Sequence, residues 1–359
     1  MPLLQDAAAL HGLDRGFLVL AAAVGVLLLT SLAFAVLALA LRVRNDRTTR
    51  RQERLRSRWE PAMLEILGGA APPDAIFERV EDDDGIDFLE FLLDYARRLK
   101  GEEQQRVRVM AEPYLPLVIP MLREGTAEAR GHAVLIFARM GMPTYAPAVA
   151  GALRDESPIV AMIAARSLFR PGHERHFSAV LEHLPRFTSW SRSFLASMLA
   201  AGGPAAASLL RDILANPLEQ PLVPAVASDA LRELNGLDAV PTALDLLAAA
   251  GADATVDREL VVGCLRILEQ LGHQEHLSTV RLFVDSPDAV IRAAAVSALA
   301  GLGGVSEIPI LQAKLDDSTF WVSLEAARGL MTLGETSTLE RIAASRGPWS
   351  LLAQQVLAE

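Results

Sequence analysis

The sequence predicts an all-α fold, an α-solenoid of stacked helix pairs with a period of about 31 residues, preceded by one transmembrane helix. A helical pattern that ends in glycine recurs along the last two thirds of the 359-residue chain. A run of 25 residues near the N-terminus carries no charge. The composition agrees with these patterns, since 51% of the residues are hydrophobic and only 5% are aromatic. Such a composition favours close packing of helices through small side chains.

The uncharged run extends from Phe17 to Leu41. At about 1.5 Å per residue, a helix of this length exceeds a hydrocarbon core of roughly 30 Å. A cleaved signal peptide fits less well, because the run is too long and the residues before it are net acidic. We therefore expect a transmembrane helix at residues 17–41, with residues 1–16 as a short extracytoplasmic tail.

Residues 42–60 are predicted to form a basic juxtamembrane helix. Because positive residues stay on the cytoplasmic side, they place the N-terminus outside and the rest of the chain in the cytoplasm. The scarcity of lysine, found only at Lys100 and Lys314, is typical of GC-rich bacterial coding and suggests a bacterial inner membrane. Two roles stay open for the arginines: contact with anionic lipid headgroups, or fixing the topology alone. The candidate membrane-surface residues are Arg42, Arg44, Arg47, Arg50, Arg51, Arg54 and Arg58.

Residues 61–124 are predicted to form a helical N-terminal cap without visible repeats. Their acidic cluster, Glu81 to Asp87, resembles a calcium loop in part. An EF-hand is excluded, because positions one and twelve of the loop would be Val80 and Phe91, which carry no side-chain oxygen. We expect Asp84 to cap the helix that follows it.

Glycines at intervals of 31 to 36 residues mark the predicted repeat array at residues 125–359. Glycine often ends a helix in the left-handed conformation, which it adopts without penalty. Before each glycine lies an apolar pattern with the 3.6-residue period, and after it a shorter helix such as the one expected at residues 308–315. A final half-repeat is expected at residues 349–357. The repeat-defining glycines are Gly141, Gly172, Gly203, Gly236, Gly272, Gly303 and Gly334.

The most regular unit is residues 286–303, which align with residues 316–334 at a shift of 31. Its pattern of Asp, a small residue or Pro, Val/Ile-Arg, paired small residues, Leu and Gly resembles HEAT repeats, especially the short HEAT-like form of bilin lyases and of single-pass bacterial membrane proteins. The arginine of that family is kept at Arg130, Arg192 and Arg292 and replaced by Ala161 and Ser323 elsewhere. The resemblance implies an armadillo-like solenoid. The repeats diverge most at residues 203–272, which hold Pro217, Pro221, Pro224 and Pro241 and an insertion around Gly251 to Thr255.

No motif for catalysis, cofactor binding or metal binding stands out, so we predict none of these sites. His173 and His176 form a pair that recurs at His273 and His276, but each pair alone offers too few ligands for a structural zinc ion. Turn and helix-start roles fit these histidines better. The single Cys264 occupies the position of a small packing residue in the repeat. The His-Glu pairs of HEAT-type di-iron hydroxylases are replaced here by paired alanines.

The sequence thus favours a membrane-anchored cytoplasmic scaffold that recruits another protein, rather than an enzyme. Related anchored arrays suggest a role beside envelope or polysaccharide machinery. Residues 59–359 carry a net charge of -15, which disfavours nucleic acid and predicts a partner with a neutral or basic surface. Two alternatives stay open, namely an enzyme or enzyme chaperone of the bilin-lyase kind, and a self-associating structural array.

Overall fold

The computed structural model describes residues 27, 29–36, 39, 42, 50–215, 222–252, 257–345, 347 and 349–359. The chain divides into two compact units, Met1–Val118 and Ile119–Glu359. All regular structure in the described part is helical, in agreement with the predicted all-α class.

The predicted transmembrane helix at residues 17–41 lies largely outside the described residues, and the tail at residues 1–16 lies wholly outside them. Residues 27, 29–36 and 39 of that run are described and are helical. Within the described part of the chain, no helix combines the length and the apolar character that crossing a bilayer requires. The anchor therefore stays a prediction.

The first unit has a core of aromatic side chains. A continuous helix at residues 50–67 contributes Trp59, which is buried and packs edge-on against Phe88 with ring centroids 5.1 Å apart. The indole Nε1 of Trp59 donates a hydrogen bond of 3.0 Å to the carbonyl of Arg79. This helix crosses from the predicted juxtamembrane segment into the predicted cap, and so ties the two together. The remaining helices of this unit are η1 (Pro73–Arg79), η2 (Asp82–Asp84), α2 (Gly85–Ala96), α3 (Gly101–Ala111) and η3 (Glu112–Val118).

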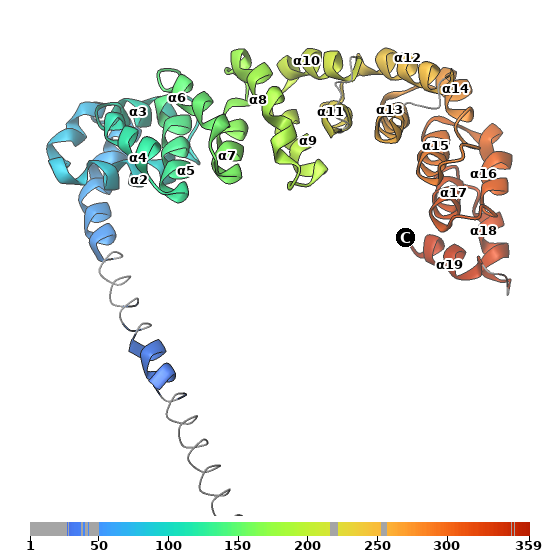
Figure 1. Cartoon of the computed structure of the whole chain (residues 1–359), viewed down its shortest axis with the longest axis horizontal. Coiled ribbons are helices and arrows are strands. Elements are labelled where there is room, and N and C mark those ends of the chain that lie inside the picture. Colours follow the sequence, from blue (N-terminus) through green and yellow to red (C-terminus); the bar gives the residue numbers. More distant parts are fainter. Residues whose placement is uncertain are drawn as a thin grey trace, which may run out of the picture. The chain divides into compact units, whose positions relative to one another are not determined.

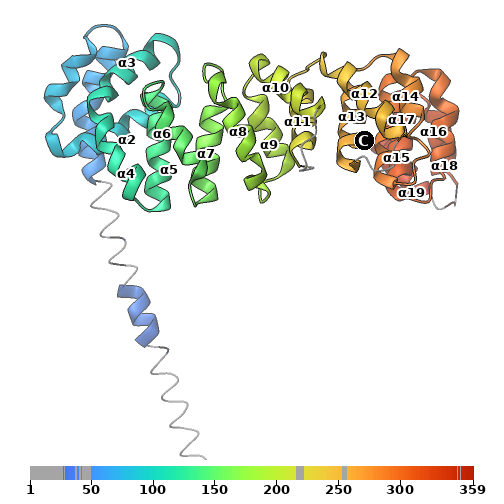
Figure 2. The ribbon, with the colours of Figure 1, turned by 45° about the horizontal axis from the view of Figure 1, so that its top comes forward.

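The second unit is an α-solenoid, as the repeats predict. Its helices alternate between two rows (Figures 1 and 2), and α5, α7, α9, α11, α13, α15, α17 and α19 form the row of first helices. In this row α13 contacts α15, α15 contacts α17, and α17 contacts α19. Most first helices also pack on a second helix, as α17 does on α16. Where successive first helices contact one another, as from α9 to α19, neighbouring repeats share one core.

The first helices are α5 (Ala127–Ile136), α7 (Pro158–Leu168), α9 (Arg192–Ala200), α11 (Leu222–Glu233), α13 (Arg258–Leu271), α15 (Ala289–Leu302), α17 (Phe320–Thr332) and α19 (Ser350–Ala358). The second helices are α4 (Ile119–Glu124), α6 (Ala146–Gly151), α8 (Phe177–His183), α10 (Pro204–Ala215), α12 (Ala239–Ala252), α14 (Leu277–Arg281), α16 (Ile308–Lys314) and α18 (Thr336–Ala343). Short turns of other helical types are η4 (Phe137–Gly141), η5 (Ala152–Arg154), η6 (Glu174–His176), η7 (Leu184–Phe187), η8 (Gln274–His276) and η9 (Val305–Glu307).

The predicted template repeat forms α15. The Asp288 carboxylate caps this helix by accepting hydrogen bonds from the backbone N–H groups of Val290 at 2.8 Å and Ile291 at 3.3 Å. The paired alanines Ala294 and Ala295 are buried, because α15 lies between α13 and α17 in the row. Small side chains at this position allow the neighbouring helices to approach closely.

The repeat-marking glycines serve two different steric needs. Gly172, Gly203 and Gly334 are left-handed, with φ of 88°, 69° and 77°, as the sequence predicts. At Gly272 and Gly303 the backbone is extended, and Gly141 and Gly236 also lack a positive φ, so the prediction of a left-handed residue is wrong at these four positions. A Cβ atom at Gly303 would lie 2.5 Å from the carbonyl oxygen of Leu299 and 2.5 Å from Cγ of Glu307. Glycine is required there by close packing.

The diverged part of the array, residues 203–272, contains α10, α11, α12 and α13. Pro224 and Pro241 lie in the first turns of α11 and α12, where a missing N–H costs no helical hydrogen bond. The predicted insertion around Gly251 to Thr255 lies partly outside the described residues, which leave out 253–256 and 216–221.

Candidate protein-binding surface

Exposed apolar side chains recur at the second residue of several first helices. Ile159 in α7, Val290 in α15, Trp321 in α17 and Leu351 in α19 occupy this position. The helix core does not require apolar side chains at this position, since the following residue turns inward. In α17, for example, Val322 is fully buried while Trp321 is 65% exposed.

Three of these side chains lie on consecutive, contacting helices at the end of the array. We call Val290, Phe320, Trp321 and Leu351 the apolar row. Val290 is 47% exposed and Leu351 is 76% exposed. Phe320 packs edge-on against Trp321, with ring centroids 5.6 Å apart. Since α15 contacts α17 and α17 contacts α19, the row forms a repeated apolar feature at the starts of three helices. Grouped exposed apolar residues of this kind mark interaction surfaces.

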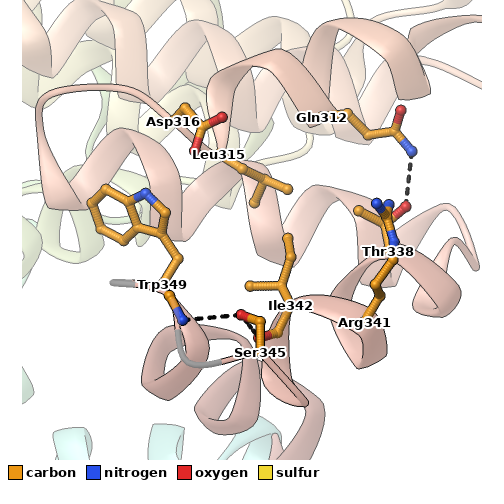
Figure 3. Close-up of a pocket in the computed structure, with 9 residues that line it drawn as sticks. Gln312, Leu315, Asp316, Thr338, Arg341, Ile342, Ser345 and Trp349 are labelled. Carbon is orange, nitrogen blue, oxygen red and sulfur yellow. Dashed lines mark hydrogen bonds between the residues drawn. The ribbon is translucent and has the colours of Figure 1, made fainter.

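A pocket of about 360 Å³ lies between α16, α18 and the start of α19 (Figure 3). We call it the Trp349 pocket. Its volume is near the lower end of the range of roughly 300–1,000 Å³ that is usual for ligand sites. It is lined by Gln312, Leu315, Asp316, Thr338, Arg341, Ile342, Ser345, Gly347 and Trp349.

Several polar groups of the Trp349 pocket are already paired. Nε2 of Gln312 donates a hydrogen bond of 2.9 Å to Oγ1 of Thr338, and Oγ of Ser345 donates one of 2.7 Å to the carbonyl of Ile342. The carboxylate of Asp316, by contrast, is exposed and forms no hydrogen bond or ion pair with any residue in the described part of the chain. In the view of Figure 3, Asp316 and Trp349 are drawn on one side of the pocket, and Thr338 and Arg341 on the other.

The candidate membrane-surface arginines fall into three groups. Arg44 and Arg47 lie outside the described residues, and Arg42, Arg50 and Arg54 are exposed. Arg51 and Arg58 instead form ion pairs with the acidic cluster of the first unit. Nη2 of Arg51 lies 3.0 Å from Oδ1 of Asp84 and 2.8 Å from Oδ2 of Asp87, and Nη1 of Arg58 lies 2.7 Å from Oε1 of Glu81.

The prediction that the Asp84 side chain caps a helix is wrong, although the residue stands at the predicted position. Asp84 occupies the N-cap position of α2, but its side chain makes no capping hydrogen bond. Its buried carboxylate accepts a hydrogen bond from Arg51 instead. A charged partner from the helix at residues 50–67 therefore replaces the backbone N–H groups of α2.

The paired histidines take part in turns. The backbone N–H of His273 donates a hydrogen bond of 3.0 Å to Nδ1 of His276, which closes the turn before α14. In the other pair, the carboxylate of Glu174 accepts a hydrogen bond of 2.7 Å from the backbone N–H of Gly172. Burial lowers the pKa of His176. Across the described ranges, no group of three or more His, Cys, Asp or Glu side chains is arranged to hold a metal ion.

Cys264 is a packing residue, as its place in the repeat predicts. It is fully buried in α13, and burial raises the pKa of its thiol to about 12. A thiol with such a pKa is protonated at neutral pH and is therefore a poor nucleophile.

Sequence reasoning missed the apolar row and the Trp349 pocket. A signal for the row is present in the alignment of the repeats, where Ile159, Val290 and Trp321 stand beside the first buried position in place of a polar residue. No comparable signal exists for the pocket, because its walls come from α16, α18 and the segment before α19. These three segments are brought together only by the packing of the helices.

A sequence profile of HEAT repeats matches residues 254–331. This segment, which includes α13 to α16 and most of α17, is similar to HEAT repeats. It also contains three members of the apolar row. No curated protein sequence gives a significant match to the chain.

The solved structures to which the chain is similar are of two kinds. One is the complex of CpcE and CpcF of phycocyanin lyase from Nostoc sp. PCC7120, with a TM-score of 0.34 and 20% identity, covering 68% of this chain and 86% of that chain. Another is the karyopherin Kap121p bound to the extreme C-terminus of the protein phosphatase Cdc14p, with a TM-score of 0.42 and 14% identity, covering 82% of this chain and 43% of that chain. A third is Kap121p bound to Ste12p, with a TM-score of 0.40 and 15% identity, covering 75% of this chain and 34% of that chain.

Proposed function

We propose that this protein is a membrane-anchored scaffold whose cytoplasmic solenoid binds a partner protein at the apolar row and so holds it at the bacterial inner membrane. The observation that carries the proposal is the repetition of exposed apolar side chains at equivalent positions of α15, α17 and α19. Burial of such side chains is the main favourable contribution to protein association. Trp321 is suited to be the central contact, since tryptophan is enriched among the residues that dominate binding.

The anchor would act by confinement. A solenoid held at the membrane surface meets a membrane-associated partner at a higher effective concentration than it would in bulk solution. The proposal of an anchor rests on the 25-residue uncharged run and the eight arginines that follow it. The apolar side chains described within that run, such as Leu29 and Phe34, are exposed and so are not used in packing against the described protein.

The ion pairs formed by some of the arginines support different roles for the individual residues. Arg51 and Arg58 are engaged by Asp84, Asp87 and Glu81, so they fix the helix at residues 50–67 to the first unit. Arg42, Arg50 and Arg54 are exposed and have no carboxylate partner within the described residues, which leaves them for lipid headgroups. We therefore assign the membrane-surface role to Arg42, Arg50 and Arg54.

Site-specific photo-crosslinking in native membranes tests the proposed binding surface. A photoreactive phenylalanine replaces Trp321 in one variant and Leu282 in a control, since Leu282 is 69% exposed but lies outside the apolar row. We expect adducts with one identifiable protein from position 321 and none from position 282. Equal labelling at both positions, or adducts with lipid alone, would contradict the proposal.

The same experiment separates the alternatives. Adducts between two copies of this chain from position 321 would indicate a self-associating array instead of a recruiting scaffold. An enzyme chaperone of the bilin-lyase kind would carry pigment, which a visible absorption spectrum of the purified full chain detects. The predicted orientation is tested separately with a C-terminal reporter that is active only in the periplasm, and we expect it to stay silent.

A further inference from the structure

The Trp349 pocket is lined by an aromatic ring and by an unpaired carboxylate. Trp349 is the residue before α19, and Asp316 lies in the turn between α16 and α17. Figure 3 shows both on the same side of the pocket, with Leu315 and Ile342 towards its middle. The adjacent Asp317 is already bound by Arg292, whereas Asp316 forms no ion pair within the described part of the chain.

This combination favours a cation with an aliphatic stem. A guanidinium or ammonium group forms a charge-assisted hydrogen bond with a carboxylate and is attracted to the face of an indole ring. The methylene groups of arginine and lysine pack against apolar surfaces while the charged end stays polar, so Leu315 and Ile342 suit the stem. Arg341 on the opposite side repels a cation and so directs it towards Asp316.

The charge around the pocket agrees with this choice. Residues 257–359 contain 13 acidic and 8 basic residues, so this part of the array attracts basic segments. An acidic ligand would meet both the net negative charge and the Asp316 carboxylate. A volume of about 360 Å³ accommodates one long side chain and not an extended cofactor.

We propose that the Trp349 pocket receives one arginine or lysine side chain from the partner protein, an inference that rests on the proposed function. The partner segment would place an apolar residue against the apolar row and its basic residue in the pocket. The apolar contact supplies affinity and the basic residue selects the partner, because charge complementarity excludes acidic segments of similar hydrophobicity.

Fluorine NMR of the full chain, solubilised in detergent and labelled with 5-fluorotryptophan, tests the pocket directly. The chain has four tryptophans, and W349F assigns the resonance of Trp349. The probe is Nα-acetyl-arginine methylamide, and the matched control is its citrulline analogue, which has nearly the same shape but no charge. We expect the arginine probe to shift the Trp349 resonance in a saturable manner and the citrulline analogue to leave it unchanged.

D316N is the decisive variant. Asp316 is exposed, so the substitution leaves the fold intact, and it should make the arginine and citrulline probes indistinguishable. A shift that is equal for both probes in the native chain, or one that D316N leaves unaltered, would overturn the proposal. Arg346 lies outside the described residues, so R346A is measured in parallel, and loss of the arginine response in R346A would also overturn it.

Crosslinking from position 321 in D316N membranes distinguishes the two proposals. Loss of the adduct together with loss of the probe response supports both. An adduct that persists at the native level means that the scaffold function stands and that the pocket does not select the partner. A probe response without any partner adduct from the native chain would assign the pocket to free cationic ligands, against our inference. Adducts between two copies of this chain would likewise contradict our inference.

Discussion

Arg292 donates two parallel hydrogen bonds to the carboxylate of Asp317, from Nε at 3.0 Å and from Nη2 at 2.9 Å. Asp317 also accepts a hydrogen bond of 2.9 Å from the backbone N–H of Thr319, which joins the pair to the turn before α17. Arg130 and Asp155 form the same arrangement at 2.8 and 2.9 Å. Each pair thus fixes one first helix to the start of the next, and both pairs are 25 residues apart in sequence.

The first prediction is that D317A destabilises the array by about 2 kcal/mol, because it leaves the Arg292 guanidinium without its partner. The two side chains are only 13% and 9% exposed, so water replaces the lost hydrogen bonds poorly. The change is measured as a lower midpoint of urea unfolding.

D285A is the matched control for this prediction. Asp285 pairs with Lys314, but its side chain is 84% exposed, so its loss should cost less than about 1 kcal/mol. If both variants unfolded at the same urea concentration, the paired arginine would not hold the repeats together.

The second prediction concerns the stability of the fold at low pH. The hydrogen bond from Arg130 holds the pKa of Asp155 below its ordinary value, and the one from Arg292 does the same for the pKa of Asp317. A carboxylate whose pKa is lower in the folded state stabilises the fold above its unfolded pKa, and this stabilisation is lost as the pH falls through the folded pKa. We therefore expect stability to fall below about pH 4.

Thermal unfolding of the native chain and of the double variant D155N/D317N between pH 6 and pH 3 checks the acid prediction. The variant should be less stable at pH 6 and should lose less stability on acidification, since its amides do not titrate. If stability fell equally with pH in the native chain and in the double variant, other carboxylates would cause the acid sensitivity, and the prediction would be wrong.

The sequence predicts the repeat array well because its determinants are local. The helix expected before Gly303 is α15, and the second helix expected at residues 308–315 is α16 at Ile308–Lys314. Apolar periodicity and a terminal glycine determine both. The HEAT resemblance also identifies Arg130 and Arg292, but their partners become evident only when the constant spacing to Asp155 and Asp317 is compared.

The features that escape the sequence depend on contacts between distant segments. Trp59 follows a basic stretch that is typical of a solvated helix, yet it is buried against Phe88 in the first unit. The Trp349 pocket combines three segments in the same way. The position of Arg51 against Asp84 likewise depends on docking of one helix on another, and this docking overrides the local preference of Asp84 for capping.

The third prediction distinguishes two reasons for glycine at position 303, namely close packing and the conformation of the turn. G303A should destabilise the chain by about 1–2 kcal/mol, because its Cβ atom would lie 2.5 Å from the carbonyl oxygen of Leu299 and from Cγ of Glu307. Glu307 is buried and bound by Arg281, so it has little freedom to move aside. G304A is the control, since the nearest atom to a Cβ atom there, outside the adjacent residues, is Nε2 of Gln274 at 3.8 Å.

The two glycine variants are compared by urea unfolding. G304A should lie within about 0.5 kcal/mol of the native chain. A loss of stability in G304A as large as that in G303A would mean that the conformation of the turn, and not the space at Gly303, requires glycine.

The fourth prediction is that the Cys264 thiol is inert in the folded protein. Burial in α13 raises its pKa to about 12, so almost no thiolate is present at pH 8, and a reagent has no direct access to the sulfur. A colorimetric thiol reagent should therefore react with the native chain only as fast as the array opens, and with one thiol per chain once urea unfolds it. D317A should react faster than the native chain, because a less stable array opens more often. Reaction of the native chain at the rate of a free cysteine would show that α13 does not protect the thiol.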